Sequence, residues 1–352
     1  MTLSKEKILF LVHTEYHMMV ALTIIADNFA DATKYDIIIY QTEDYSKRRF
    51  QFQKDIHLLP NLNYIVIRYD ENSNTFNEEL FKAVHTISRT GFSRFVMFNH
   101  HSFLAIYLSR KLALKNTRIV LAPDGLKPYS NTRRMTPRWS LKTAIKFYKF
   151  IKGNRLSYFF HYPSLEYANL KEISLIYIHF PKAFLNFRNI VTKEVKVLES
   201  ENSKHLVSRY FKFSTSNEEI FNNVIFFINQ PLNNQDIYNF EIDLLEQIKL
   251  KFPHYKLVIK LHPLTDYDHV EKFKALNATI ISETYPAELY IAQLKHSIVL
   301  SFWSTASLID NPSCRFYWLY PMLQNRGIML SYINIQNPTE HILEVSSIEQ
   351  LQ

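Results

Sequence analysis

The chain has 352 residues, of which 47% are hydrophobic and 21% charged, and its formal net charge is +8. This composition excludes a mainly disordered chain, and the length suits about two core-forming domains. The positive charge favours anionic partners such as nucleic acid, acidic lipid or a phosphorylated substrate. The single cysteine, Cys314, excludes an intrachain disulfide and a cysteine-rich zinc site, and it fits a reducing compartment.

Glycine is scarce, with only four residues in the chain. They cannot form a Gly-x-Gly-x-x-Gly fingerprint or a Walker loop, so any phosphate must be held in another way. The N-terminal apolar run has no small-residue cleavage site, and we interpret it as a first β-strand. No apolar stretch reaches the roughly 18 residues that span a bilayer, so we expect a chain that is soluble or bound at a membrane surface.

The first part of the chain alternates apolar, β-branched runs with helical patterns, which predicts a parallel sheet flanked by helices. The predicted strands are residues 7–12, 35–40, 63–68, 94–98 and 118–122. Helical patterns cover residues 75–88 and 103–114. From residue 136 to 210 the pattern becomes aromatic, basic and mostly helical, and we interpret this segment as the connection between two domains.

A second alternating series follows. Its predicted strands are residues 223–228, 256–261, 279–282 and 297–301, and its predicted helices are residues 240–252, 268–276 and 287–295. The sequence therefore predicts an α/β protein of two Rossmann-like domains, residues 1–210 and 211–352.

Ligands of open α/β sheets bind outside the carboxyl ends of the strands, and this rule selects few positions. They are residues 13–17, 99–101 and 123–125 in the first domain, and Gln230-Pro231, His262-Pro263 and residues 303–307 in the second.

Two of these positions carry one titratable group each. Asp124 follows a predicted strand and lies in a turn that Gly125 allows to bend sharply. Such an Asp can serve the turn alone through local hydrogen bonds, but its position at the mouth of the domain favours a functional role. His262 is held at the rim of the sheet because Pro263 stops the strand. An imidazole there could donate to a phosphate or protonate a leaving group, or it could be a polar strand end.

Two further positions suit a nucleotide. Ser304 and Thr305 stand where a helix is expected to begin, and their hydroxyls could bind a phosphate, cap the helix, or do both. Glu288 lies in the first turn of a predicted helix, where the dipole favours an acid in any case; its functional interpretation is a carboxylate that accepts the ribose hydroxyls.

Metal binding is not favoured. Asp266 and Asp268 have the spacing of a metal and nucleotide-diphosphate clamp, but Asp268 stands at the start of a predicted helix and is expected to be its N-cap. Four histidines follow strand ends without a carboxylate or cysteine to complete a metal site, and we expect them to line an acceptor pocket or to bond the sheet ends: His13, His17, His100 and His101. We predict neither a metal nor a cofactor.

The segment from Arg133 to Arg155 mixes basic residues with Trp139 and other aromatics and contains no acid. This composition is typical of an interfacial helix on anionic lipid. It would also suit RNA stacking, or a solvated basic face.

The motifs occur in a recognisable order. They are Pro-Asp-Gly at 123–125, Phe-Ile-Asn-Gln-Pro-Leu at 227–232, Lys-Leu-His-Pro at 260–263, Pro-Ala-Glu at 286–288 and Trp-Ser-Thr-Ala-Ser at 303–307. This set resembles the bacterial GT-B sialyltransferases of the lipooligosaccharide and capsular polysialic acid groups, which carry an acidic-acidic-Gly, a His-Pro and a Ser-Ser/Thr motif in that order. The resemblance implies an N-terminal acceptor-binding and a C-terminal CMP-sugar-binding domain facing across a cleft.

The resemblance also implies a reaction, which is inverting, metal-independent transfer of sialic acid, or a related nonulosonic or Kdo-like sugar, from a CMP-sugar to a hydroxyl of a bacterial surface glycan. Asp124 would be the general base, and His262 would bind the CMP phosphate and protonate it as it leaves. Ser304 and Thr305 would hold that phosphate, and Glu288 would take the ribose.

Four other residues are candidates for substrate binding: Gly125, Gln230, Pro263 and His17. The chain departs from the family pattern at Pro123, which replaces the first acid, so the assignment of Asp124 requires the base to be the second acid.

Two alternative functions remain open at this point. A CDP-polyol phosphotransferase of the teichoic-acid kind also uses a GT-B frame and histidines. A non-enzymatic basic protein that binds membrane or RNA is the other alternative. For the transferase we expect a cytoplasmic protein, peripheral at the inner face of the bacterial membrane through Arg133 to Arg155, without a nucleic-acid partner.

Overall fold

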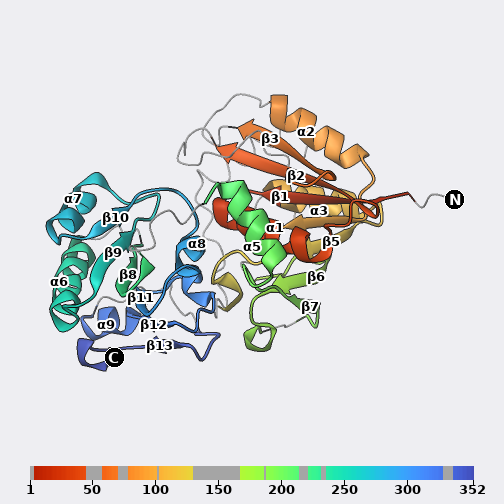
Figure 1. Ribbon diagram of the computed structural model, residues 1–352. Helices are drawn as coiled ribbons and strands as arrows, with labels where there is room; N and C mark the ends of the chain where they lie inside the picture. The colour runs from red at the N-terminus through yellow and green to blue at the C-terminus, as the bar shows by residue number, and fades with distance from the viewer. Residues whose placement is uncertain are drawn as a thin grey trace. The chain divides into compact units, whose positions relative to one another are not determined.

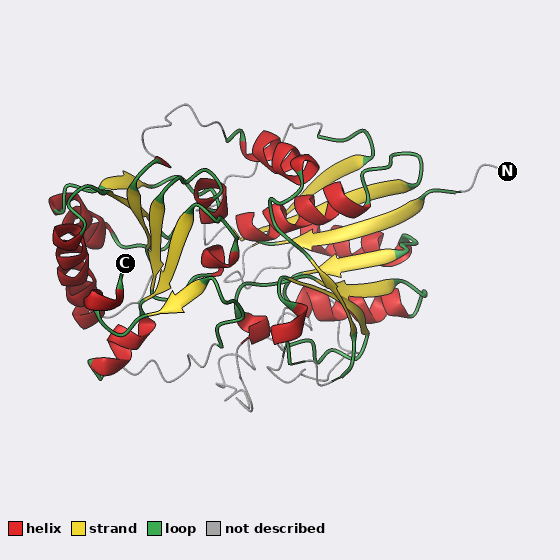
Figure 2. Cartoon of the chain, turned by 60° about the horizontal axis from the view of Figure 1, so that its bottom comes forward, coloured by secondary structure: helices red, strands yellow, loops and turns green. Residues whose placement is uncertain are grey.

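The structure is a computed structural model that describes residues 4–44, 58–69, 78–100, 103–129, 167–185, 188–213, 221–230, 235–327 and 336–352. The chain divides into two units, Met1–Tyr210 and Phe211–Gln352. Each unit contains one parallel sheet with helices on both faces, which confirms the predicted α/β class (Figures 1 and 2).

The sheet of the first unit has the strand order β3-β2-β1-β4-β5-β6-β7. Its strands are β1 (Glu6–Val12), β2 (Tyr35–Asp44), β3 (Leu62–Tyr69), β4 (Arg94–Met97), β5 (Arg118–Leu121), β6 (Ile173–Ile178) and β7 (Val191–Glu194). The central strand β1 is buried from Ile8 to Val12, as expected for a strand covered on both faces.

Among the described residues of this unit, the α-helices that cover the sheet are α1 (Glu15–Asn28), α2 (Glu78–Arg89), α3 (Phe103–Ala113) and α5 (Glu201–Phe211). Helix α1 begins at once after β1 because Thr14 caps it, accepting a hydrogen bond from the His17 N–H at 3.1 Å. Helices α2 and α3 contact each other on one face, and α1 lies on the other (Figure 1). This arrangement is the one that right-handed crossovers produce.

The sheet of the second unit has the strand order β10-β9-β8-β11-β12-β13. Its strands are β8 (Val224–Ile228), β9 (Lys256–Lys260), β10 (Thr279–Ile281), β11 (Ser297–Ser301), β12 (Cys314–Trp318) and β13 (Ile342–Glu344). Its helices are α6 (Gln235–Lys251), α7 (Tyr267–Ala275), α8 (Ala287–Ile291) and α9 (Tyr320–Asn325). The core between sheet and helices is rich in phenylalanine, including Phe227, Phe273 and Phe302.

The order of the strands reverses between β1 and β4 in the first unit and between β8 and β11 in the second. At such a switch point the connections leave to opposite faces and open a crevice at the carboxyl ends of the strands. The candidate residues follow the carboxyl ends of strands at or near these two points. Ser304 follows β11 at the switch point itself, whereas Asp124 follows β5 and His262 follows β9, each one strand away from it.

Every strand predicted from the sequence is present, with ends displaced by a few residues, but the prediction was incomplete. Strands β6 and β7 lie in the segment interpreted as a mostly helical connection, so that interpretation was wrong there. Residues 297–301 are not the last strand, because β12 and β13 follow. The apolar, β-branched run of β6 and the aromatic residues of β12 are themselves strand signals that the interpretation overlooked.

One further prediction on local structure has a clear outcome. Helix α7 begins at Tyr267, so Asp266 occupies the N-cap position and Asp268 lies in the first turn, contrary to the prediction that Asp268 is the cap. The segment from Arg133 to Arg155, His101 and Pro231 lie outside the described residues. None of the helices in the described ranges is long and apolar enough to cross a membrane.

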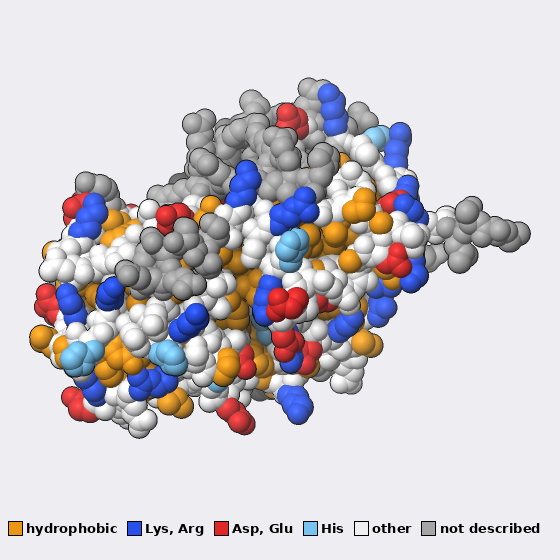
Figure 3. Space-filling model, viewed as in Figure 1, with side chains coloured by type: hydrophobic (Ala, Val, Ile, Leu, Met, Phe, Trp, Pro, Cys, Tyr) orange, Lys and Arg blue, Asp and Glu red, His pale blue; other side chains and the backbone are white. Residues whose placement is uncertain are grey.

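Surface charge is mixed on the face shown in Figure 3. Lys and Arg side chains of the described residues alternate there with Asp and Glu side chains and form no continuous basic surface. The visible part of this face therefore gives no support to a large nucleic-acid footprint, which would need clustered positive charge.

Candidate active site

Asp124 is held by two basic side chains at the exit of β5. Its Oδ1 accepts a hydrogen bond from His17 Nε2 at 3.0 Å, and its Oδ2 forms an ion pair with Lys127. Gly125 follows with φ of 67°, a left-handed conformation that turns the chain sharply after the carboxylate. The partner 107 residues away shows that Asp124 is more than a locally bonded turn residue.

His17 is buried behind this carboxylate. The ring lies in the first turn of α1 and stacks on Phe98, with centroids 4.6 Å apart. Only 3% of the residue is exposed, and in the described part of the chain its Nδ1 has no hydrogen-bond partner. His17 is a candidate for substrate binding from the sequence, and in the structure its Nε2 contacts the Asp124 carboxylate.

The charge state of Asp124 follows from these neighbours. Burial acts to raise the pKa of the Asp124 carboxyl, but the hydrogen bond and charge of His17 and the charge of Lys127 outweigh it. The pKa of Asp124 therefore lies well below its ordinary value, and the group is a carboxylate at neutral pH.

Two other histidines of this unit have lowered pKa values. Burial, reinforced by the charge of His17, lowers the pKa of His13 to about 3. Burial also lowers the pKa of His179 to about 4. His179 donates through Nδ1 to the Val195 carbonyl at 2.9 Å and contacts the Tyr16 hydroxyl through Nε2 at 2.8 Å.

Sequence reasoning missed His179, although it directly follows β6 and the strand-end rule would have selected it had β6 been recognised. Within the described ranges, no group of three or more His, Cys, Asp or Glu side chains is arranged to hold a metal ion. His100 instead packs edge-on against Tyr167, with ring centroids 5.4 Å apart.

His262 follows β9 in the second unit with a defined ring orientation. Its Nδ1 accepts a hydrogen bond from the Leu264 N–H at 3.1 Å, and its carbonyl accepts one from the Thr265 N–H at 2.9 Å. Strand β9 ends at Lys260, and Pro263 directly follows His262. Because Nδ1 is an acceptor, the neutral ring carries its proton on Nε2, which suits it to donate to an anion.

Ser304 and Thr305 follow β11 at the start of a short 3₁₀ helix, Thr305–Leu308. The Ser304 Oγ accepts from the Ala306 N–H at 3.2 Å, which is the predicted capping role. Gln230 binds the main chain just before them through both of its polar atoms. Its Nε2 donates to the Trp303 carbonyl, and its Oε1 accepts from the Trp303 N–H at 2.9 Å.

Glu288 is buried in the first turn of α8, with 6% of the residue exposed. Burial raises its pKa to about 7, although a backbone hydrogen bond and the charge of Lys260 act in the opposite direction. A buried carboxyl whose two oxygens must be satisfied is a suitable acceptor for a pair of hydroxyls.

The raised pKa of Glu288 predicts a pH-dependent stability. Because the folded-state pKa of about 7 exceeds the ordinary glutamate pKa of 4.5, the associated stability is present below pH 4.5 and is lost as pH rises through 7. The free energy of unfolding of Glu288→Gln, measured in urea, should therefore equal that of wild type at pH 4.5. At pH 8 it should exceed that of wild type by on the order of 3 kcal/mol. The control is Glu246→Gln, an exposed position in the same unit; equal curves for wild type and Glu288→Gln at pH 8 would contradict the prediction.

Part of the chain is similar to a known family of glycosyltransferases. Residues 171–315 match the model of glycosyltransferase family 52, a segment that includes His262, Glu288 and Ser304 but not Asp124. A search of the curated proteins gives no match.

Solved sialyltransferases of Photobacterium have a similar fold. The α/β-galactoside α-2,3-sialyltransferase of Photobacterium phosphoreum is 13% identical, with a TM-score of 0.56 over 99% of this chain and 100% of that chain. A Photobacterium 2,6-sialyltransferase, solved with CMP and lactose, is 13% identical, with a TM-score of 0.56 over 97% of this chain and 78% of that chain. The GT-B domain of the Photobacterium damselae enzyme is 12% identical, with a TM-score of 0.55 over 96% and 99%.

At these identities the solved structures establish the GT-B fold. The family match covers fewer than half of the residues of the chain, and it agrees with the resemblance inferred from the motifs. Fold and family match together support a glycosyltransferase.

Proposed function

We propose that the protein transfers sialic acid, or a related CMP-activated nonulosonic or Kdo-like sugar, from its CMP-sugar to a hydroxyl of a bacterial surface glycan. The observation that carries the proposal is the state of Asp124, an ionised carboxylate held at a strand exit by His17 and Lys127. The match of the segment containing His262 to a glycosyltransferase family supports it, as does the solved relative that binds CMP and lactose.

In the proposed reaction the acceptor hydroxyl oxygen attacks the anomeric carbon of the sugar, and its proton passes to Asp124. The bond from that carbon to the phosphate oxygen breaks, and its electron pair leaves with CMP. His262 donates its Nε2 proton toward the departing phosphate, while Ser304, Thr305 and nearby main-chain N–H groups stabilise its charge. Attack and departure on opposite sides of an oxocarbenium-like centre invert its configuration.

The proposed reaction is independent of metal because of the leaving group. CMP leaves with a single phosphate, which develops less charge than a nucleoside diphosphate. An imidazole N–H and hydroxyl donors are therefore sufficient partners. Glu288 is assigned to the ribose, and its carboxylate form, which prevails above pH 7, is the better hydroxyl acceptor.

The acceptor is proposed to be capsule or lipooligosaccharide. The basic, aromatic and acid-free composition of the segment from Arg133 to Arg155 supports a peripheral position on an anionic membrane surface. The first unit is assigned to the acceptor and the second to the CMP-sugar.

The direct test is CMP release by the purified protein with CMP-sialic acid in the presence of a glycan acceptor and EDTA. Turnover with CMP-sialic acid is expected, with none from UDP- or GDP-sugars, and NMR of the product should show the inverted anomer. Release of CMP from a CDP-polyol but not from CMP-sialic acid would overturn the proposal and favour a polyol phosphotransferase. Full loss of activity with EDTA, restored by a divalent metal, would overturn metal independence.

A further inference from the structure

Two consecutive amide side chains leave the central strand β8 and contact the loops on either side of it. Strand β8 lies between β9 and β11 in the sheet. Asn229 contacts the loop after β9, which contains His262, and Gln230 contacts the loop after β11, which contains Ser304. Consecutive residues of extended backbone point in opposite directions, so this pair can reach both loops.

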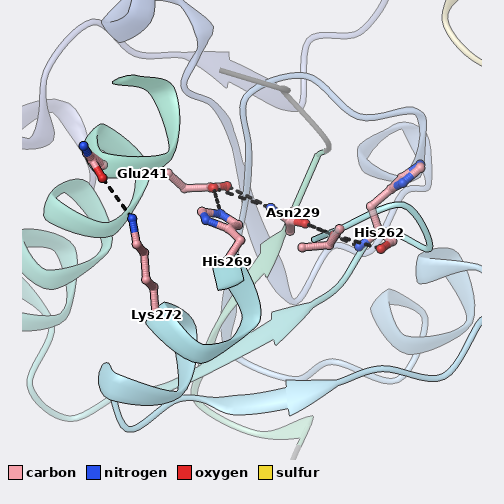
Figure 4. A network of polar contacts seen from close by, with 7 residues as sticks. Asn229, Glu241, His262, His269 and Lys272 are labelled. Atoms are coloured by element: carbon pink, nitrogen blue, oxygen red, sulfur yellow. Dashed lines mark hydrogen bonds and ion pairs between the residues drawn. The ribbon is translucent and has the colours of Figure 1, made fainter. Parts of the chain in front are cut away.

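The Asn229 amide has partners on both of its ends. Its Oδ1 lies 2.5 Å from the Thr265 hydroxyl and 3.5 Å from the His262 N–H, so it accepts from the loop that carries the imidazole. Its Nδ2 donates to Glu241 Oε1 at 3.2 Å. Figure 4 shows Asn229 between Glu241 and His262, with the His262 ring directed away from the amide. An amide is suited to this place because it combines a donor and an acceptor.

The Glu241 carboxylate is itself fixed by His269. Its Oε2 lies 2.6 Å from His269 Nε2, and the two residues are only 1% and 2% exposed. The His269 ring packs between Tyr238 and Phe273, with centroids 4.1 Å and 4.3 Å away. Burial raises the pKa of Glu241, against the hydrogen bonds from His269 and Asn229.

A buried acid and imidazole are a poor source of stability. Their desolvation cancels most of the attraction between them, so an apolar pair of similar size would stabilise the core at least as well. Their connection to the His262 loop through Asn229 offers a different reason for their presence. They hold the amide in the orientation that presents Oδ1 to Thr265.

We propose that Asn229 and Gln230 are positioning residues that set the place of His262 relative to Ser304 and Thr305, and that the Glu241–His269 pair holds Asn229 in orientation. The proposal rests on the proposed function for the roles of His262 and Ser304. It adds the residues that act through them without contacting the donor.

A double-mutant cycle tests this role. Asn229→Leu should lower kcat by about tenfold to a hundredfold with a smaller rise in the KM of the CMP-sugar, because a displaced His262 weakens both its contact with the phosphate and the departure of CMP. In a His262→Ala background the same substitution should lower kcat by less than about twofold, since residues that act through one another are not additive. Equal losses in both backgrounds would overturn the proposal in favour of a general structural role.

Thr265→Val provides a second variant, because it removes only the hydroxyl that is bonded to Asn229 Oδ1. It should lower kcat by less than Asn229→Leu does, and this loss of kcat should also disappear in the His262→Ala background. Asn311→Leu is the matched control. Asn311 also bonds main-chain carbonyls, those of Ile291 and Leu294, at 2.8 Å and 2.9 Å, but it precedes β12 at the other end of the sheet. This control should lose comparable stability and keep its kcat.

Hydrogen exchange separates this proposal from the proposed function. In Asn229→Leu the amides of Leu264 and Thr265 should exchange at least about tenfold faster, and in Gln230→Leu the amide of Trp303 should do so. Unchanged exchange at these amides in the folded variants would overturn the proposal whatever the activity. Full activity of His262→Ala would instead overturn the assigned role of His262, and the exchange rates would still decide whether the network holds the loops.

Discussion

Asp124→Asn is expected to lower the rate of sugar transfer by roughly a thousandfold while leaving the affinity for CMP unchanged. The amide has the size of the carboxylate and can still accept the hydrogen bond from His17, but it cannot take the proton of the acceptor hydroxyl. The measurement is kcat for CMP release at saturating donor and acceptor, with CMP binding followed by calorimetry.

The chain offers a matched control for this substitution. Asp31 also pairs with a lysine three residues later, Lys34, and its pKa is also depressed, first by the hydrogen bond from Thr33, but it lies on the surface before β2. Asp31→Asn should therefore keep full activity. Wild-type kcat in Asp124→Asn would remove Asp124 from the mechanism.

The substitution His17→Phe should change the pH dependence of kcat. The phenyl ring keeps the stacking on Phe98 but loses the hydrogen bond, so burial of Asp124 is less well offset and the pKa of Asp124 rises. In wild type the depressed pKa keeps the base ionised throughout the usual assay range. The acidic limb of the kcat profile should therefore move to higher pH in His17→Phe, and an unmoved limb would show that His17 does not act on the base.

The strand-end rule explains how much of the site was predictable. Asp124, His262 and Ser304 each follow a run of apolar residues that is recognisable by itself, and each stands where the rule placed it. The strands that were not predicted show the limit of this rule. Strand β6 lies in an aromatic, basic segment that was interpreted as helical, so the rule could not select His179 at its end. A local pattern identifies a strand only when the surrounding composition does not suggest another structure.

The partners of these residues could not be predicted from the sequence. His17 and Asp124 are 107 residues apart, and Asn229 and Glu241 lie on a strand end and a helix whose packing the pattern does not specify. Gln230 stood as a substrate-binding candidate, yet both of its polar atoms contact Trp303. Strand ends reveal where polar groups gather, whereas tertiary packing decides which of them meet the substrate and which hold their neighbours.

His262 allows the two roles of an imidazole at a leaving phosphate to be separated. His262→Ala should lower kcat by about a hundredfold or more, because both the hydrogen bond and the proton are lost. His262→Gln restores a side-chain N–H donor but not a proton that can be transferred near neutral pH. If His262 protonates the departing CMP, the Gln variant should recover CMP affinity yet remain nearly as slow as the Ala variant.

The structure favours proton donation because the Leu264 N–H engages Nδ1 and leaves the ring proton of neutral His262 on Nε2. The control is His254→Ala, since His254 is exposed just before the other end of β9 and should be dispensable. Recovery of most of the wild-type kcat in His262→Gln would show that the imidazole acts as a hydrogen-bond donor alone. Wild-type kcat in His262→Ala would instead exclude the residue from the reaction, and with it the proposed role of the loop after β9.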